Sequence, residues 1–208
     1  MDVEGDTNEV VTFPPMSGGE MPRMNEKQLY VRVLIPRKRI FALRDNWMDI
    51  YTPIVKHMKL QIRFNQNSKS VEIRTSQHTD DAGAINKARD FVRAFVYGFE
   101  LQDAVALLRV ENLTIETFTT DEVRQTLHGD HTLRSLGRII GLNGRIKFTM
   151  ENTTKTRIVV DGKRVTIMGS PSNCKIARDC VCRLIIGTPP GKIFSRLQTL
   201  SPIIADQL

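Results

Sequence analysis

The chain has 208 residues, of which 40% are hydrophobic and 25% are charged, and its net charge is +7. This composition is ordinary for a folded protein and excludes fibrous chains. No apolar run approaches the roughly 18 residues of a membrane-spanning helix, and no positively charged start precedes an apolar signal segment. We therefore expect one large domain or two small ones, each with a modest core.

The first 22 residues are predicted to form an acidic, flexible tail. They contain five carboxylates and no basic residue: Asp2, Glu4, Asp6, Glu9 and Glu20. Residues 23–208 consequently carry 30 basic against 18 acidic groups, a net charge of +12. A body this basic attracts polyanions at long range, and its binding to them weakens as the salt concentration rises.

Residues 23–110 are predicted to form a first unit that begins with a strand, "LYVRVLIP". "PRKR" at 36–39 could act as a weak nuclear import signal, but we expect a solvated loop there. "NWMDIYTPIVKHM" is compatible with a helix that Pro53 distorts. Two short strands, "LQIRF" and "SVEIRT", follow. A helix then begins at Asp80 or Asp81 and buries Ile85, Ala88, Phe91, Val92, Phe95 and Val96.

Residues 111–208 are predicted to form a second unit with the same order, joined to the first by the helical and apolar link "ELQDAVALLRVEN". Its leading strand is "LTIETF", and "HTLRSLGRII" and "RIKFTMENTT" are helices. "RIVV" and "RVTIM" flank Asp161-Gly162, a strong hairpin signal. The next helix starts at Ser170 and Pro171 and ends at Gly187, before a helical extension.

An internal repeat supports two copies of one unit. "ARDFVRAFVYG" begins at Ala88 and "ARDCVCRLIIG" begins at Ala177, and they share five residue types at identical offsets. Each unit then reads strand, short helix, helix, strand, strand, helix. A three-stranded sheet covered on one face by helices would bury the apolar stripes of both copies. We expect an α+β fold and a rigid two-unit body.

The second unit carries two glycines three apart between its first two helices, in Gly141-Leu142-Asn143-Gly144. Glycines permit a tight turn and close backbone approach, and the following helix presents free N–H groups and the positive end of its dipole. This order with this motif resembles the KH domain, whose G-x-x-G loop clamps about four single-stranded nucleotides. The expected architecture is two tandem type I KH-like units, βααββα.

The predicted RNA-binding residues surround that loop. Apolar residues before it and "RIVV" at 157–160 are expected to form the walls of a groove, and the nearby cations are candidate phosphate contacts. Its middle pair lacks a basic residue, so the clamp is expected to use backbone N–H groups and flanking cations. The candidates are Arg138, Ile139, Ile140, Gly141, Leu142, Asn143, Gly144, Arg145, Lys147, Arg157, Lys163 and Arg164.

The first unit lacks a G-x-x-G loop. When the two units are aligned so that Ile158 in "RIVV" matches Ile62 in "IRF", the four loop residues 141–144 match Asp45, Asn46, Trp47 and Met48. None of these is glycine. Residues 23–127 carry 17 basic and 13 acidic groups, a net +4, whereas residues 128–208 carry 13 and 5, a net +8. Positive charge is concentrated where the glycines are, so the first unit alone is not expected to bind RNA.

With both units in place, the chain resembles the partner-of-NOB family of small-ribosomal-subunit assembly factors. The resemblance rests on segments such as "FPPMSG", "GDHTLRSLGRIIGLNGRIKFTMENTTKTRIVV" and "IIGTPPGKIF". It implies a non-enzymatic factor, without cofactor or metal, on the 3′ region of small-subunit pre-rRNA. Its implied partners are the NOB endonuclease, the rRNA dimethylase, and other pre-40S proteins. The implied location is the nucleolus and nucleus, with passage to the cytoplasm on pre-40S particles.

The same sequence offers features of other functions. "HGDH" at 128–131 could hold a metal, but no further ligand stands at a recognisable spacing, so a polar turn is expected. Cys174, Cys180 and Cys182 crowd into one helix and suggest reduced, buried thiols. An RRM would need aromatic strands, and only 6% of residues are aromatic. A tandem-KH regulator of mRNA and a mainly protein-binding scaffold remain as alternatives.

Overall fold

The structure is a computed structural model that describes residues 29–79, 81, 83–110, 112–125 and 129–205, with backbone alone for 201–205. The predicted acidic tail lies outside the described residues, as do Asp80 and His128. Two three-stranded antiparallel sheets form the framework, with strand orders β1-β3-β2 and β4-β6-β5. The predicted α+β fold with two KH-like units is confirmed.

The first unit contains β1 (Tyr30–Leu34), α1 (Arg37–Asp45), α2 (Trp47–Thr52), β2 (Gln61–Asn65), β3 (Ser70–Arg74) and α3 (Ala84–Tyr97). A π-helical turn, η1 (Pro53–His57), follows α2, because Pro53 offers no N–H to the regular helical ladder. The α3 helix buries the predicted stripe on the sheet, except that Val96 is only partly buried. The predicted distortion at Pro53 is therefore present.

The interpretation of "PRKR" as a solvated loop is wrong. Arg37 begins α1, with Pro36 in the extended N-cap conformation that suits a residue just before a helix. The Arg39 guanidinium donates a 2.7 Å hydrogen bond to the Phe95 carbonyl and lies over the Phe95 ring. The sequence around this basic run does not show that the end of α3 packs beside it and supplies partners for Arg39.

The second unit follows a helical link, α4 (Leu101–Arg109), as predicted. Its elements are β4 (Thr114–Thr119), α5 (Thr120–Val123), α6 (Asp130–Ile140), η2 (Leu142–Gly144), α7 (Arg145–Thr154), β5 (Arg157–Asp161), β6 (Arg164–Gly169), α8 (Pro171–Ile186) and α9 (Pro190–Ala205). The Ser170 hydroxyl accepts the Asn173 N–H at the start of α8, and Gly187 ends the helix with φ +117°. Both predicted ends of α8 are confirmed.

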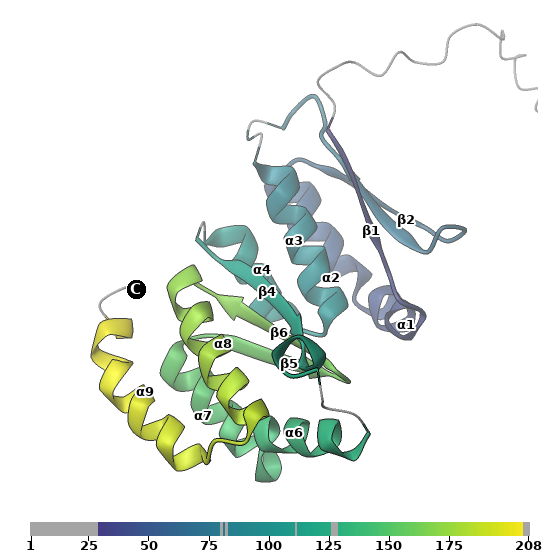
Figure 1. Cartoon of the computed structure of the whole chain (residues 1–208). Coiled ribbons are helices and arrows are strands. Elements are labelled where there is room, and N and C mark those ends of the chain that lie inside the picture. Colours follow the sequence, from purple (N-terminus) through teal and green to yellow (C-terminus); the bar gives the residue numbers. More distant parts are fainter. Residues whose placement is uncertain (1–28, 80, 82, 111, 126–128, 206–208) are drawn as a thin grey trace, which may run out of the picture.

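The two units pack in successive layers (Figure 1). The helices of the first unit cover one face of its own sheet, and the second sheet lies against the other side of those helices. Met168 of β6 is buried in the first unit's core, and Ile115 and Val159 pack against that core. Ile158, Val165 and other side chains on the opposite face of the second sheet form a separate core with α6, α7 and α8. One sheet thus serves both cores.

Buried cysteines occupy α8 as predicted. Cys174 and Cys180 are buried and Cys182 is partly buried. Burial raises the pKa of the Cys174 and Cys180 thiols to about 11, so both are protonated at neutral pH. In the described ranges, no three His, Cys, Asp or Glu side chains could share a metal ion. No helix in the same ranges is both long and apolar enough to cross a membrane.

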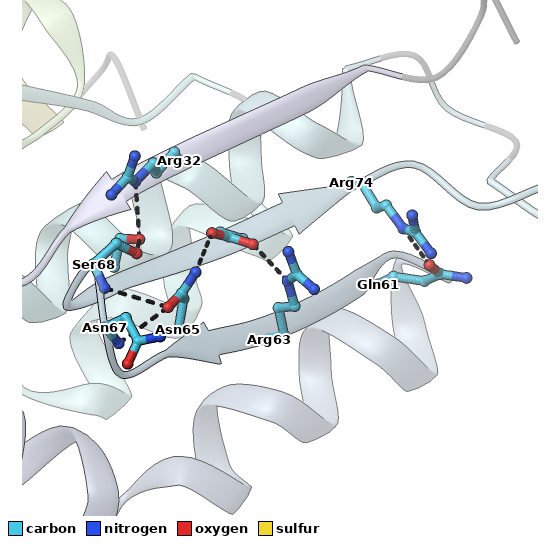
Figure 2. A network of polar contacts seen from close by, with 9 residues as sticks. Arg32, Gln61, Arg63, Asn65, Asn67, Ser68 and Arg74 are labelled. Atoms are coloured by element: carbon cyan, nitrogen blue, oxygen red, sulfur yellow. Dashed lines mark hydrogen bonds and ion pairs between the residues drawn. The ribbon is translucent and has the colours of Figure 1, made fainter. Parts of the chain in front are cut away.

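The outer face of the first sheet carries a polar network (Figure 2). The Glu72 carboxylate is only 6% exposed and accepts hydrogen bonds from Arg63 and Asn65. Arg32 donates to the Ser70 hydroxyl at 3.0 Å. The hydrogen bond from Arg63, followed by that from Asn65, lowers the pKa of Glu72 below its ordinary value of 4.5.

Glu72 is expected to make the folded protein sensitive to acid. Because its pKa is lower in the folded than in the unfolded chain, its stabilising effect is complete above the unfolded value and disappears as the pH falls through the folded value. Urea unfolding of the protein and of Glu72→Gln, between pH 7 and pH 3, tests this. The stability difference between the two should shrink in acid, and a difference independent of pH would contradict the assignment.

Candidate nucleic-acid interface

The glycine loop is a left-handed turn between α6 and α7. Gly141 has φ +73° and ψ −178°, a conformation open to glycine, and Gly144 has φ +76° and ψ 6°. Asn143 between them is also left-handed, with φ 52°. Asparagine is among the few side chains that adopt this region readily. Three of four loop residues therefore suit the backbone they adopt, and the turn exposes main chain.

The two glycines have different roles. A Cβ on Gly141 would stand 2.6 Å from Cγ1 of Ile146, which is too close, so α7 needs a glycine there in order to approach. Around Gly144 nothing lies within 4 Å of a Cβ. Gly141 thus serves the packing of the loop, whereas the space at Gly144 stays open to a ligand.

The first turn of α7 is suited to an anion. Its N-cap is Gly144, which has no side chain that could accept the first N–H groups. No acidic residue lies in that turn, and Arg145 begins it. The Arg145 N–H is bonded to the Leu142 carbonyl within the turn. The positive end of the helix dipole, with no side-chain cap and no carboxylate beside it, favours a phosphate at this position.

The cations next to the loop are not equally available. Arg145 is exposed and makes no side-chain polar contact with the described residues. Lys147 lies 3.8 Å from the Glu151 carboxylate, one helical turn away. Arg138 donates a 2.9 Å hydrogen bond to the Ile185 carbonyl near the end of α8. Arg145 is therefore the strongest phosphate candidate of the three, and Arg138 also ties α6 to α8.

Two predicted contact residues have partners within the protein. Ile139 is fully buried in the second core, because it faces the sheet from the last turn of α6. Arg157 forms a 2.9 Å ion pair with Asp103 of α4, since alternate residues of β5 face the first unit. That bond to Asp103 raises the pKa of Arg157. Ile139 therefore does not line an open groove, whereas Arg157 is exposed and already paired with Asp103.

The remaining predicted residues lie at two places. Ile140, Leu142 and Asn143 are exposed at the loop, with Leu142 78% exposed. Lys163 is in the β5–β6 turn and pairs with Asp121 at 3.1 Å. Arg164 lies with its guanidinium carbon 6.0 Å from the centre of the Tyr97 ring, between the two units. The structure thus brings the loop residues together but places Arg164 on a different surface.

Phe148 is a candidate that sequence reasoning missed. It is 62% exposed on α7, one turn after Gly144, while Ile146 and Met150 take the buried side of the helix. An exposed aromatic ring beside a phosphate-binding turn can stack on a base. The signal was present, because Phe148 falls off the i, i+4 stripe that Ile146 and Met150 define.

The corresponding junction in the first unit has no such turn. Asn46 separates α1 from α2 with φ −102°, and its side-chain amide donates to the Ala42 carbonyl at 2.8 Å. Met48 is 66% exposed and Trp47 packs near Tyr51 and Phe64. Bulky side chains occupy the place of the glycines, so the main chain here is shielded.

Comparison with protein families finds a KH domain in each half of the chain. Residues 117–202 match the model described as a eukaryotic type KH domain of type I, the second KH domain of PNO1. Residues 30–109 match the model described as the first KH domain of Krr1. The match at 30–109 covers the first sheet and its helices, and the match at 117–202 runs from within β4 to within α9.

Similar proteins carry names that refer to RNA. The chain is 47% identical over 196 residues to the RNA-binding protein pno1 of Dictyostelium discoideum, covering 94% of this chain and 80% of that protein. It is 44% identical over 188 residues to the pre-rRNA-processing protein PNO1 of Candida albicans, covering 90% of this chain and 68% of that protein. Among solved structures, a complex of Dim2p with a/eIF2α and rRNA from Pyrococcus horikoshii is similar, with 29% sequence identity and a TM-score of 0.76. The match covers 86% of this chain and 97% of that chain.

Proposed function

Because the chain belongs to the PNO1 family of KH-domain RNA-binding proteins that act in pre-rRNA processing, we propose that it holds the 3′ region of small-subunit pre-rRNA in the pre-40S particle. The observation that carries this proposal is the glycine turn at 141–144, where α7 starts without a side-chain cap or a carboxylate and with the exposed Arg145 as its first residue. Single-stranded RNA supplies the phosphates that such a turn accepts.

The protein acts by binding, without catalysing a reaction. Holding the 3′ region in a defined conformation would present it to a NOB-type endonuclease, the enzyme that cuts there. The rRNA dimethylase and pre-40S proteins are the further proposed partners. We place the protein in the nucleolus and nucleus, with export to the cytoplasm on pre-40S particles.

Crosslinking in cells, followed by sequencing of the bound RNA, tests this function. We expect crosslinked reads to concentrate at the 3′ end of the small-subunit precursor, and the endonuclease to be recovered with the tagged protein. Reads spread over messenger RNAs would contradict the proposal and favour a tandem-KH regulator. Such a regulator is disfavoured here because linked weak sites need a working loop in each unit, and the first unit lacks one.

A further inference from the structure

A second basic surface lies between the two units, away from the glycine loop. Two adjoining cavities of about 650 and 370 Å³ share Arg89, Arg93 and Tyr97 of α3 in their walls. The larger one also contains Arg32 of β1 and Arg164 of β6. We call these two cavities together the inter-unit cleft. Neither unit forms it alone, because Arg164 comes from the second sheet and the other three arginines from the first unit.

The charges in the cleft do not balance. Among the residues that line it, Asp90 is the sole carboxylate facing four guanidinium groups. The Asp90 carboxylate accepts hydrogen bonds from Nε and Nη2 of Arg89, and its Oδ1 lies 4.0 Å from Nη1 of Arg93. Arg32 uses Nε on the Ser70 hydroxyl. Arg164 faces the Tyr97 ring instead of an acid. The cleft therefore has a net charge of about +3 and guanidinium N–H groups left to donate.

The type and placement of these cations point to phosphate. Guanidinium forks match phosphate oxygens in bidentate geometry, and arginine is the preferred cation for nucleic-acid backbones. Tyr97, which is partly exposed in both cavities, adds an aromatic face of the kind on which bases stack. An acidic polypeptide would use the charge but not the ring, so RNA is the better match.

The cleft begins beside the β5–β6 turn. Arg164 directly follows that turn, which also carries Lys163, and Asp161 at its other side is paired with Lys38 of α1. A KH loop holds only about four nucleotides. A longer strand has further phosphates to neutralise, and the cleft supplies cations from both units, away from the loop.

We propose that the inter-unit cleft binds backbone phosphates of an RNA segment that extends beyond the nucleotides held at 141–144. This rests on the proposed RNA-binding function and adds a second contact to it. The first unit then contributes to RNA affinity through α3, although its own loop position has no glycine.

The test compares two single-stranded RNA probes, one of about five nucleotides and one of about twenty, on the full chain. Arg89→Ala with Arg93→Ala should weaken binding of the long probe roughly tenfold or more at 0.1 M salt and reduce its log–log salt slope by about 1.4, the value for two lost phosphate contacts. Binding of the short probe should not change. The matched control is Arg44→Ala with Lys56→Ala, two exposed cations of the first unit outside the cleft, which change the net charge equally.

The outcomes separate the two proposals. If the variant bound the long probe with unchanged affinity and salt slope while still binding the short probe, the cleft proposal alone would be overturned. A role of the cleft in binding an acidic protein would not rescue it. Loss of long-probe affinity in the control variant to the same degree would also overturn it, because net charge would then explain the effect. Failure of the wild-type chain to bind the short probe would count against the proposed loop site. A photocrosslink from the long probe to the Tyr97 peptide, absent with the short probe, is the expected direct readout.

Discussion

Replacing Gly144 with aspartate should lower affinity for single-stranded RNA by about 100-fold and leave the fold in place. Two like charges about 4 Å apart repel by about 1 kcal/mol in water and about 4 kcal/mol near a protein surface. A loss of about 2.7 kcal/mol, within that range, is 100-fold in affinity. The Cβ at this position meets nothing within 4 Å, so the side chain can be accommodated.

Gly144→Asn is the matched control for this variant. Asparagine has the same size and the same tolerance of positive φ, as Asn143 next to it shows, but it carries no charge. Both variants should lose about 1 kcal/mol of stability to backbone strain. Fluorescence anisotropy with a short RNA and thermal unfolding of both proteins provide the measurements. If aspartate and asparagine bound RNA equally well, the turn would not face a phosphate.

Gly141 is the wrong glycine for that experiment, although the sequence makes the two look equivalent. Its Cβ would collide with Ile146, so any substitution displaces α7. The close contact and the positive φ should each add a cost of about 1–3 kcal/mol. A loss of binding in a Gly141 variant would therefore report an altered loop and could not be assigned to charge.

Met168→Asp should destabilise the whole chain and separate the two units. Met168 is 4% exposed and lies on the second sheet, but its side chain belongs to the first unit's core. A carboxylate left without a partner in such a site costs about 3–5 kcal/mol. For a protein of this size that corresponds to a decrease in melting temperature of roughly 10 °C.

Met168→Leu is the control, because a swap of similar volume usually costs less than about 1.5 kcal/mol. Calorimetry should show one cooperative transition for the wild type and for Met168→Leu. Met168→Asp should show a lower and broader transition, or two. A single transition at the wild-type temperature would mean that the units do not depend on this contact. The variant should also lose the long-RNA affinity assigned to the cleft, since Arg164 would no longer be held beside α3.

Local patterns explain why most of the fold could be predicted. The Ser170 cap, the Asp161-Gly162 hairpin turn and the glycine at 187 act through neighbouring residues, so their effect is readable from the chain. The repeat from Ala88 and Ala177 identified two copies of one unit. The contacts that the sequence does not reveal join partners distant in sequence. Nothing near "PRKR" reveals that Arg39 meets Phe95, and nothing near Arg157 reveals Asp103.

The amino-acid sequence by itself determined the two KH-like units, the glycine turn at 141–144 and the excess of positive charge in the second unit, because helix caps, hairpin turns and apolar periodicity are local. Only the tertiary structure decided which cations remain available to RNA. The availability of each cation depends on which face of the second sheet packs against the first unit. This packing pairs Arg157 with Asp103 and brings Arg164 next to the arginines of α3. Strand register and layer packing set these distances, and they join residues more than fifty positions apart.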